Sequence, residues 1–321
     1  MNWFELFKIN PLKSLLLTSN PVLNYFIERD LLEQKGNLIE TLWQIPEVEK
    51  ILKKQQVNGS WKYPGKNMDE DMGSNHDLLE TFRNLRYLVE KYGFNRQHSA
   101  LRAAAEYVFS CQTEEGDIRG IISNQYMPYY MGAILELLIK AGYQQDALVE
   151  KGMNWLLSMR QEDGGWIIPL QMFKITYLYQ VAKDPPIPPD RGKPSAHLAT
   201  GMVLRAFAAH TDYRKLIEIK RAGDLLKSRF FLKDFYNDHQ GVKYWTKFEF
   251  PFWWTDLLSS LDTLYWLGFT RDNADIARGL AWFIENQPQD GLWKGSYEKR
   301  ADMHLWVTLA VCRIFKNYYS R

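Results

Sequence analysis

The spacing of apolar residues along the chain predicts helices throughout. One stripe, at intervals of three and four residues, is formed by Leu78, Phe82, Leu85 and Val89, and residues 148–159 repeat this spacing. An amphipathic helix presents such a stripe to a neighbouring element. Three apolar segments close with a glycine and a large apolar residue, at Gly93-Phe94, Gly142-Tyr143 and Gly268-Phe269. This pair is typical of a left-handed helix C-cap, so we expect a helix to end at each position.

A turn rich in glutamine, glycine and tryptophan recurs between these helices. Four copies are present: QQVNGSW at residues 55–61, QTEEGDI at 112–118, RQEDGGW at 160–166 and QPQDGLW at 287–293. They share the pattern Gln-x3-Gly-x-Trp, from which Ile118 and Arg160 depart. The interval from a cap glycine to the next turn glycine is 23, 22 and 23 residues. This constancy fixes the length of the helix between them.

These positions define a repeating unit of an inner helix, a short link, an outer helix and a turn. A unit that cannot bury its apolar stripe alone must stack on its neighbours. We expect one domain over residues 45–321 with five helix pairs, including a degenerate copy at 235–245. Residues 1–44 are expected to form helices that pack on this domain, and they make a sixth pair if 22–32 and 39–43 are both helical. The proline-rich segment 184–194 predicts a surface loop or a lid.

Composition narrows the functional classes. The net charge of +2 and the pI of about 8.3 are balanced, and scattered basic residues give no nucleic-acid footprint. Cys111 and Cys312 lie in apolar helical patterns, which favours a reducing, cytoplasmic location. The longest N-terminal apolar run is Leu15 to Leu17, too short to span a membrane. We therefore expect a soluble protein in which residues 2–17 make at most a weak peripheral membrane contact.

On its four turns the sequence resembles the superfamily of terpenoid cyclases and protein prenyltransferases. The repeat of squalene cyclases carries the QW motif, in which Gln, Asp, Gly and Trp follow an outer helix. The match is best at residues 160–166 and 287–293, and the resemblance covers about residues 45–315. It implies an all-α fold, an α/α toroid whose inner helices surround a central cavity. It implies less about activity, because enzymes and non-catalytic thioester domains share this toroid.

In a toroid, the turns deliver the chain to the starts of the inner helices, which face the central mouth. Polar and aromatic residues collect at these starts. The candidate catalytic residues there are Asp77 and Asp256, and the candidate binding residues are Tyr129, Tyr130, His197, Trp253, Trp254, His304 and Trp306. Aromatic ring faces stabilise cations. The alternative is that these aspartates cap helices and the aromatic residues only pack.

Two further acids, Asp69 and Asp71, follow the first turn by a few residues. Squalene cyclases and related class II cyclases carry Asp-x-Asp-Asp after such a turn, and one neutral carboxyl there donates a proton to an alkene or epoxide. Like-charged neighbours and poor solvation keep that carboxyl protonated. The resemblance therefore implies Asp71, or Asp69, as a proton donor. The fourth position here is Met72, so a solvated acidic loop is the alternative.

The first functional hypothesis is an isoprenoid-processing enzyme that cyclises or isomerises a small terpenoid by proton transfer, without a cofactor. The first alternative is a non-catalytic toroid that binds a ligand or serves as a scaffold. The second is a carbohydrate-active lyase or hydrolase that uses Asp256 with His197. Prenyltransferases bind zinc, and Asp302 and His304 with His197 or His76 offer ligand chemistry, but the thiolate of that family is missing. We therefore expect no metal.

Overall fold

The computed structural model describes residues 2–34, 38–65, 73–172, 184–236, 239–296 and 302–320. Over these residues the protein is helical, with isolated bridges but no strand, so the all-α prediction is confirmed. The longer helices are α3 (Pro46–Leu52), α4 (His76–Tyr92), α5 (Ser99–Ser110), α6 (Pro128–Leu138), α7 (Ala147–Ser158), α9 (His197–Ala209), α10 (Ile217–Ser228), α11 (Leu257–Trp266), α12 (Ala274–Glu285) and α13 (Met303–Tyr319). The shorter ones are η1 (Trp3–Leu6), α1 (Pro11–Leu16), α2 (Pro21–Phe26), η2 (Ile27–Leu31), η3 (Ile39–Gln44), η5 (Ile139–Tyr143), α8 (Pro169–Met172), η7 (Tyr213–Lys215) and η8 (Val242–Thr246).

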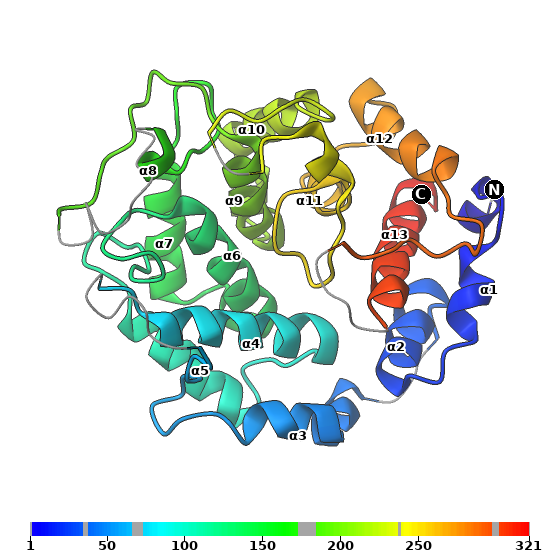
Figure 1. Ribbon diagram of the computed structural model, residues 1–321, viewed down its shortest axis with the longest axis horizontal. Helices are drawn as coiled ribbons and strands as arrows, with labels where there is room; N and C mark the ends of the chain where they lie inside the picture. Colours follow the sequence, from blue (N-terminus) through cyan, green and yellow to red (C-terminus); the bar gives the residue numbers. More distant parts are fainter. Residues whose placement is uncertain are drawn as a thin grey trace.

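The helices are arranged in an inner and an outer layer. Helices α4, α6, α9, α11 and α13 each pack against the next, and they follow one another around the view in Figure 1. Helices α5, α7, α10 and α12 lie on the outside, against α4, α6, α9 and α11 respectively. The last inner helix, α13, also packs against η1, α1 and η2 from the N-terminal segment. None of the described helices is long and apolar enough to cross a membrane.

The predicted helix ends at Gly93, Gly142 and Gly268 are confirmed. These glycines have φ values of 62°, 97° and 82°, in the left-handed region that other residues rarely adopt. At the first of them the backbone N–H of Phe94 donates to the carbonyl of Leu88 at 2.9 Å, as in a Schellman cap. The ring of Phe94 is buried and provides the hydrophobic contact that accompanies this cap.

In the first two turns a glutamine side chain joins one unit to the next. Gln55 Nε2 donates to the carbonyl of Gly59 in its own turn and to that of Ala100 at the start of α5, at 2.9 and 2.8 Å. Gln112 Nε2 binds its own turn in the same way and reaches the carbonyl of Leu148 in α7 at 2.9 Å. The turn of one unit is therefore bonded to the outer helix of the next.

In the third and fourth turns the glutamine side chain forms hydrogen bonds with segments that are not outer helices. In the third turn Gln161, one residue after the expected position, donates to the carbonyls of Asp190 and Lys193. The proline-rich segment is a loop over 184–194 and takes the place of an outer-helix start there. In the fourth turn Gln287 accepts from the backbone N–H of Ile9 and donates to its carbonyl, at 2.9 and 2.6 Å. The N-terminal segment thus occupies the position of the next unit.

Each turn tryptophan is also bonded to an inner helix. The backbone N–H donates to a threonine hydroxyl at 3.0 Å in the pairs Trp61–Thr81, Trp166–Thr200 and Trp293–Thr308. The indole N–H groups of Trp61 and Trp166 donate to the carbonyls of Ile51 and Leu156, at the ends of the preceding outer helices. The three indoles are almost fully buried. The turn therefore connects an outer helix with the following inner helix through buried hydrogen bonds.

Residues 248–254, here called the central segment, lie between η8 and α11 and cross toward the middle of the view in Figure 1. Arg86 of α4 donates to Glu249 Oε1 at 2.8 Å and to the carbonyl of Pro251 at 2.9 Å. Its guanidinium also lies 4.5 Å from the ring of Trp253. Phe250 stacks on Trp306 of α13, with ring centroids 5.6 Å apart. The central segment therefore fills the space between α4 and α13.

Replacement of Thr200 by valine is expected to lower the free energy of unfolding by about 1 to 3 kcal/mol, because the backbone N–H of Trp166 loses its buried acceptor. Thr200→Ser, which keeps the hydroxyl, is the matched control and should lose less. Urea unfolding of both variants measures the difference. Because Thr200→Val keeps a methyl group and removes only the hydroxyl, an unchanged stability of this variant would contradict the prediction.

Replacement of Arg86 by methionine is expected to destabilise the fold by about 3 to 5 kcal/mol, because a buried carboxylate loses its cation. The double variant Arg86→Met/Glu249→Met should be destabilised by less than the sum of the two single variants. Urea unfolding of the three variants completes this cycle. Additive losses would show that the ion pair does not couple α4 to the central segment.

Candidate functional site

Four of the predicted aromatic residues lie in one cluster. The ring centroids of Tyr129 and Tyr130 are 4.3 Å apart, and these rings approach Trp254 and Trp253, each at 6.4 Å. Burial raises the pKa of both tyrosines, so both hydroxyls stay protonated. None of the four residues lines any of the three cavities described below. In this structure the cluster joins α6 to the central segment by packing.

The predicted acid Asp77 is held by the first turn. Its carboxylate accepts from Gln56 Nε2 at 3.0 Å and from the backbone N–H of Tyr63 at 2.9 Å. The ring of its neighbour His76 lies 5.1 Å from the ring of Tyr63. Asn75, and not Asp77, caps α4. The two acids of the cyclase-like motif, Asp69 and Asp71, lie outside the described residues.

The predicted acid Asp256 caps α11. Its carboxylate accepts from the backbone N–H of Ser259 at 2.7 Å, and the Ser259 hydroxyl accepts from the backbone N–H of Asp256 at 3.0 Å. The residue is only 3% exposed. Burial raises the pKa of Asp256 to about 7, although the hydrogen bonds from Ser259 oppose this shift. Asp256 lines none of the three cavities described below, so its raised pKa reflects burial of a capping residue.

The predicted binding residue His197 is placed apart from Asp256. Its ring lies 4.5 Å from that of Trp245, and its Nε2 lies 3.6 Å from Asp234 Oδ2. Burial lowers the pKa of His197 to about 4, against the attraction of Asp234, so the imidazole is neutral at pH 7. Asp234 also accepts from the backbone N–H groups of His197 and Leu198, which begin α9. Asp256 and His197, the pair predicted for carbohydrate chemistry, therefore contact different residues.

At the start of α13, the indole N–H of Trp306 donates to Asp302 Oδ2 at 2.9 Å, and both residues line a surface cavity of about 500 Å³. The carbonyl of His304 accepts from the Thr308 hydroxyl within the same helix. Within the described part of the chain, no group of three or more His, Cys, Asp or Glu side chains is placed to hold a metal ion. The zinc ligands considered above therefore do not converge there.

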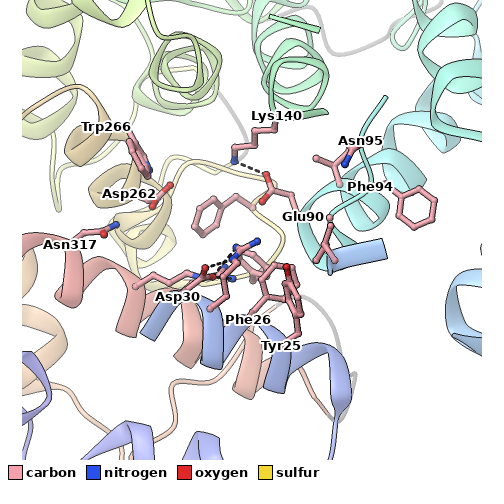
Figure 2. A pocket seen from close by; sticks show the side chains of 18 residues that line it. Tyr25, Phe26, Asp30, Glu90, Phe94, Asn95, Lys140, Asp262, Trp266 and Asn317 are labelled. Carbon is pink, nitrogen blue, oxygen red and sulfur yellow. Dashed lines mark hydrogen bonds and ion pairs between the residues drawn. The ribbon is translucent and has the colours of Figure 1, made fainter. Parts of the chain in front are cut away.

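A cavity of about 580 Å³ opens at the other end of the inner helices, near the C-terminal ends of α4, α11 and α13 (Figure 2). None of the predicted site residues that the structure describes lines it. Its aromatic lining is formed by Tyr25, Phe26, Phe94, Phe250, Phe252 and Trp266, and its charged lining by Arg29, Asp30, Glu90, Lys140, Asp262 and Arg313. A volume of this size is typical of small-molecule sites.

Most charges in this cavity are paired. Lys140 Nζ lies 2.6 Å from Glu90 Oε1 and 2.8 Å from Glu136 Oε1, and Arg313 Nη2 lies 2.6 Å from Asp30 Oδ2. Figure 2 shows the first of these pairs facing the space beside Asp262. These pairs fix the positions of the charges that line the cavity.

Asp262 differs from the other acids of the cavity. Its carboxyl has no hydrogen bond or ion pair with any described residue. Burial raises the pKa of Asp262 to about 6, and the attraction of Lys140 offsets this shift only in part. A carboxyl with such a pKa exchanges protons near neutral pH, which general acid–base catalysis requires.

The sequence carried a signal for Asp262 and for two charged residues that line a smaller cavity beside this one. Glu136, Arg205 and Asp262 each stand alone as a charged residue within an apolar inner helix, in the segments YYMGAILELL, HLATGMVLRAFAA and LLSSLDTLYW. Charged residues are rarely buried unless they are paired or functional. The analysis of the sequence considered only helix starts, and these residues lie one or more turns further along.

Comparison with known proteins leaves the family open. No family model matches the chain, and no curated protein matches it. One similar solved structure is the crystal structure of a protein from Actinoplanes, with a TM-score of 0.46 and 15% sequence identity over 87% of each chain. A likeness this distant carries no argument about activity. The resemblance to terpenoid cyclases therefore stays a prediction from the turns.

The raised pKa of Asp256 predicts a pH-dependent stability. Because its pKa is about 7 in the folded state and near 4 in the unfolded chain, the folded state binds more protons between these values. Stability attributable to Asp256 therefore falls as the pH rises from 4 to 7. Asp256→Asn, which keeps an acceptor for Ser259, should match the wild type at pH 4 and exceed it at pH 8 by up to about 4 kcal/mol. Urea unfolding across this range measures the effect, and a constant difference would contradict it.

Proposed function

We propose that this protein is an α/α toroid enzyme that carries out general acid–base catalysis on a small molecule with an apolar body. The proposed site is the cavity of about 580 Å³. The observation that carries the proposal is Asp262, an unpartnered carboxyl with a pKa of about 6 beside aromatic side chains. The resemblance of the turns suggests a small isoprenoid as the substrate and an isomerisation as the reaction.

Two observations support the toroid. Each inner helix from α4 to α13 packs against the next, and α13 packs against the N-terminal segment. The fourth turn bonds to Ile9 in the way that earlier turns bond to the following outer helix. The N-terminal segment therefore acts as the unit that follows the fourth turn.

The pKa of Asp262 restricts the chemistry. At pH 7 a carboxyl with a pKa of about 6 is about one tenth protonated, so both forms are available. Such an acid is suited to moving a proton on carbon next to a carbonyl or on an oxygen, with Lys140 near enough to stabilise developing negative charge. Protonation of an isolated alkene needs a far stronger acid. Proton-initiated cyclisation would therefore depend on Asp69 or Asp71.

The size and lining of the cavity restrict the substrate. The central segment packs between α4 and α13, and the cavity of about 580 Å³ at this end of the inner helices holds one small ligand. Its aromatic lining favours an apolar body. Leu16 and Leu17, which are 51% and 87% exposed, support a weak membrane contact through which an apolar substrate would arrive.

A second candidate is a non-catalytic toroid that binds a small ligand. The filled centre favours it, because packing accounts for the aromatic residues predicted to line a chamber. Under this alternative the cavity is a binding site and Asp262 performs no proton transfer. The carbohydrate-active alternative gains no support, since Asp256 and His197 are engaged with different partners.

Solvent deuterium uptake tests the proposed catalysis. The purified protein is incubated in D2O with monoterpenoid to diterpenoid alcohols, ketones and carboxylic acids, and products are analysed by mass spectrometry. We expect deuterium incorporation or isomerisation of at least one compound, with a rate that changes near pH 6. Asp262→Asn should lower this rate at least about 100-fold.

Asp272→Asn, at an exposed position outside the cavity, is the matched control and should keep full activity. Turnover that survives in Asp262→Asn would reject Asp262 as the acid. Saturable binding of a compound by the wild type without deuterium uptake would support the non-catalytic alternative.

A further inference from the structure

A second, smaller cavity of about 240 Å³ adjoins the proposed site and shares Lys140, Asp262 and Trp266 with it. It lies among the ends of α6, α9 and α11. Its other charged lining residues are Glu136, Arg205 and Arg214. Two of these cations, Arg205 and Arg214, belong to this cavity and do not line the larger one.

Arg205 is a buried cation whose hydrogen-bonding groups are incompletely satisfied. Its side chain is 4% exposed, and its Nε lies 2.9 Å from Glu136 Oε2, but without hydrogen-bond geometry. Nη1 finds no acceptor among the described residues, whereas Nε is paired with the charge of Glu136. A buried N–H group without a partner costs about 1 to 3 kcal/mol, more when it is charged. An unpartnered N–H group in the wall of a cavity therefore points to a ligand or an ordered water as its acceptor.

One cation of the smaller cavity has no ion-pair partner among the described residues. Glu136 is shared between Arg205 and Lys140, at 2.9 and 2.8 Å. Arg214 forms no ion pair with any residue in the described ranges. Lys140 is also paired with Glu90 at 2.6 Å, so Arg214 is the lining cation that no ion pair among the described residues offsets. An anion that enters this cavity can pair with Arg214 and with Nη1 of Arg205.

We propose that the smaller cavity is an anion subsite, in which Arg205 and Arg214 bind a carboxylate or phosphate group of the molecule whose apolar part lies in the larger cavity. Arginine suits this role because its planar guanidinium binds both groups through paired hydrogen bonds. Trp266, 48% exposed, lines both cavities and provides a ring face between the two parts of the ligand. The inference rests on the proposed site and extends it to an amphipathic, anionic substrate.

The test is anion binding measured by calorimetry, with hexanoate and hexyl phosphate as probes and hexanol as the uncharged comparison. The wild type is expected to bind at least one anionic probe saturably and more tightly than hexanol. Arg214→Gln should weaken that binding about tenfold, the effect of one lost charge-assisted contact. The preferred probe identifies the anionic group as carboxylate or phosphate.

Arg221→Gln removes an exposed arginine outside both cavities and is the matched control, expected to bind as the wild type does. Arg205→Lys keeps a cation beside Glu136, so it tests the buried arginine without leaving an unpaired carboxylate. We expect it to weaken binding as well. No saturable binding, or an equal loss in Arg221→Gln and Arg214→Gln, would overturn the subsite.

The anion-binding test is independent of the test of catalysis. Asp262→Asn should retain anion binding, because the arginines remain. Anion binding without deuterium uptake would support the subsite and reject the proposed acid–base catalysis. Deuterium uptake by a protein in which Arg214→Gln changes neither binding nor KM would reject the subsite and leave Asp262 as the acid.

Discussion

The buried ion pair between Arg86 and Glu249 determines what the middle of the molecule contains. A guanidinium in a dry interior must be paired, and Arg86 satisfies this with one carboxylate and one backbone carbonyl of the central segment. The segment is therefore bound to α4, while Phe250 packs on α13 and Trp253 on α6. The central segment therefore packs against α4, α6 and α13, and a cavity of about 580 Å³ lies near the C-terminal ends of α4, α11 and α13.

The requirement that buried polar groups have partners also explains the sequence of the turns. A turn that enters a packed interior brings backbone N–H and C=O groups with it, and each must find a partner. The conserved pattern within this chain supplies these partners through the glutamine amide, the indole N–H and a threonine on the next inner helix. In the turns where these contacts are present, the motif is thus structural. Its repetition carries information on fold and none on the reaction.

The features that the sequence predicts are local, whereas those it does not predict depend on residues that are distant in the chain. Glycine caps and turn motifs are local, so helix ends such as Gly93 and Gly268 follow from a few neighbouring residues. The partners of Arg86, Gln161 and Gln287 are distant in the chain, and no local pattern specifies them. The cavity that contains Asp262 was not found from the sequence for this reason. The helix starts are rich in polar residues because helix starts need capping, whereas the charges of the cavity stand singly in apolar helices.

Asp256 and Asp262 show why a shifted pKa does not by itself identify a site. Burial raises the pKa of both carboxyls, yet Asp256 is bonded to the start of its helix and lines neither cavity, while Asp262 has no bonded partner and lines both. The difference lies in access. A proton donor must reach a substrate, so a raised pKa indicates function only where the carboxyl also faces a space that a substrate can enter. Of the acids that cap or line the inner helices in the described structure, Asp262 meets both conditions.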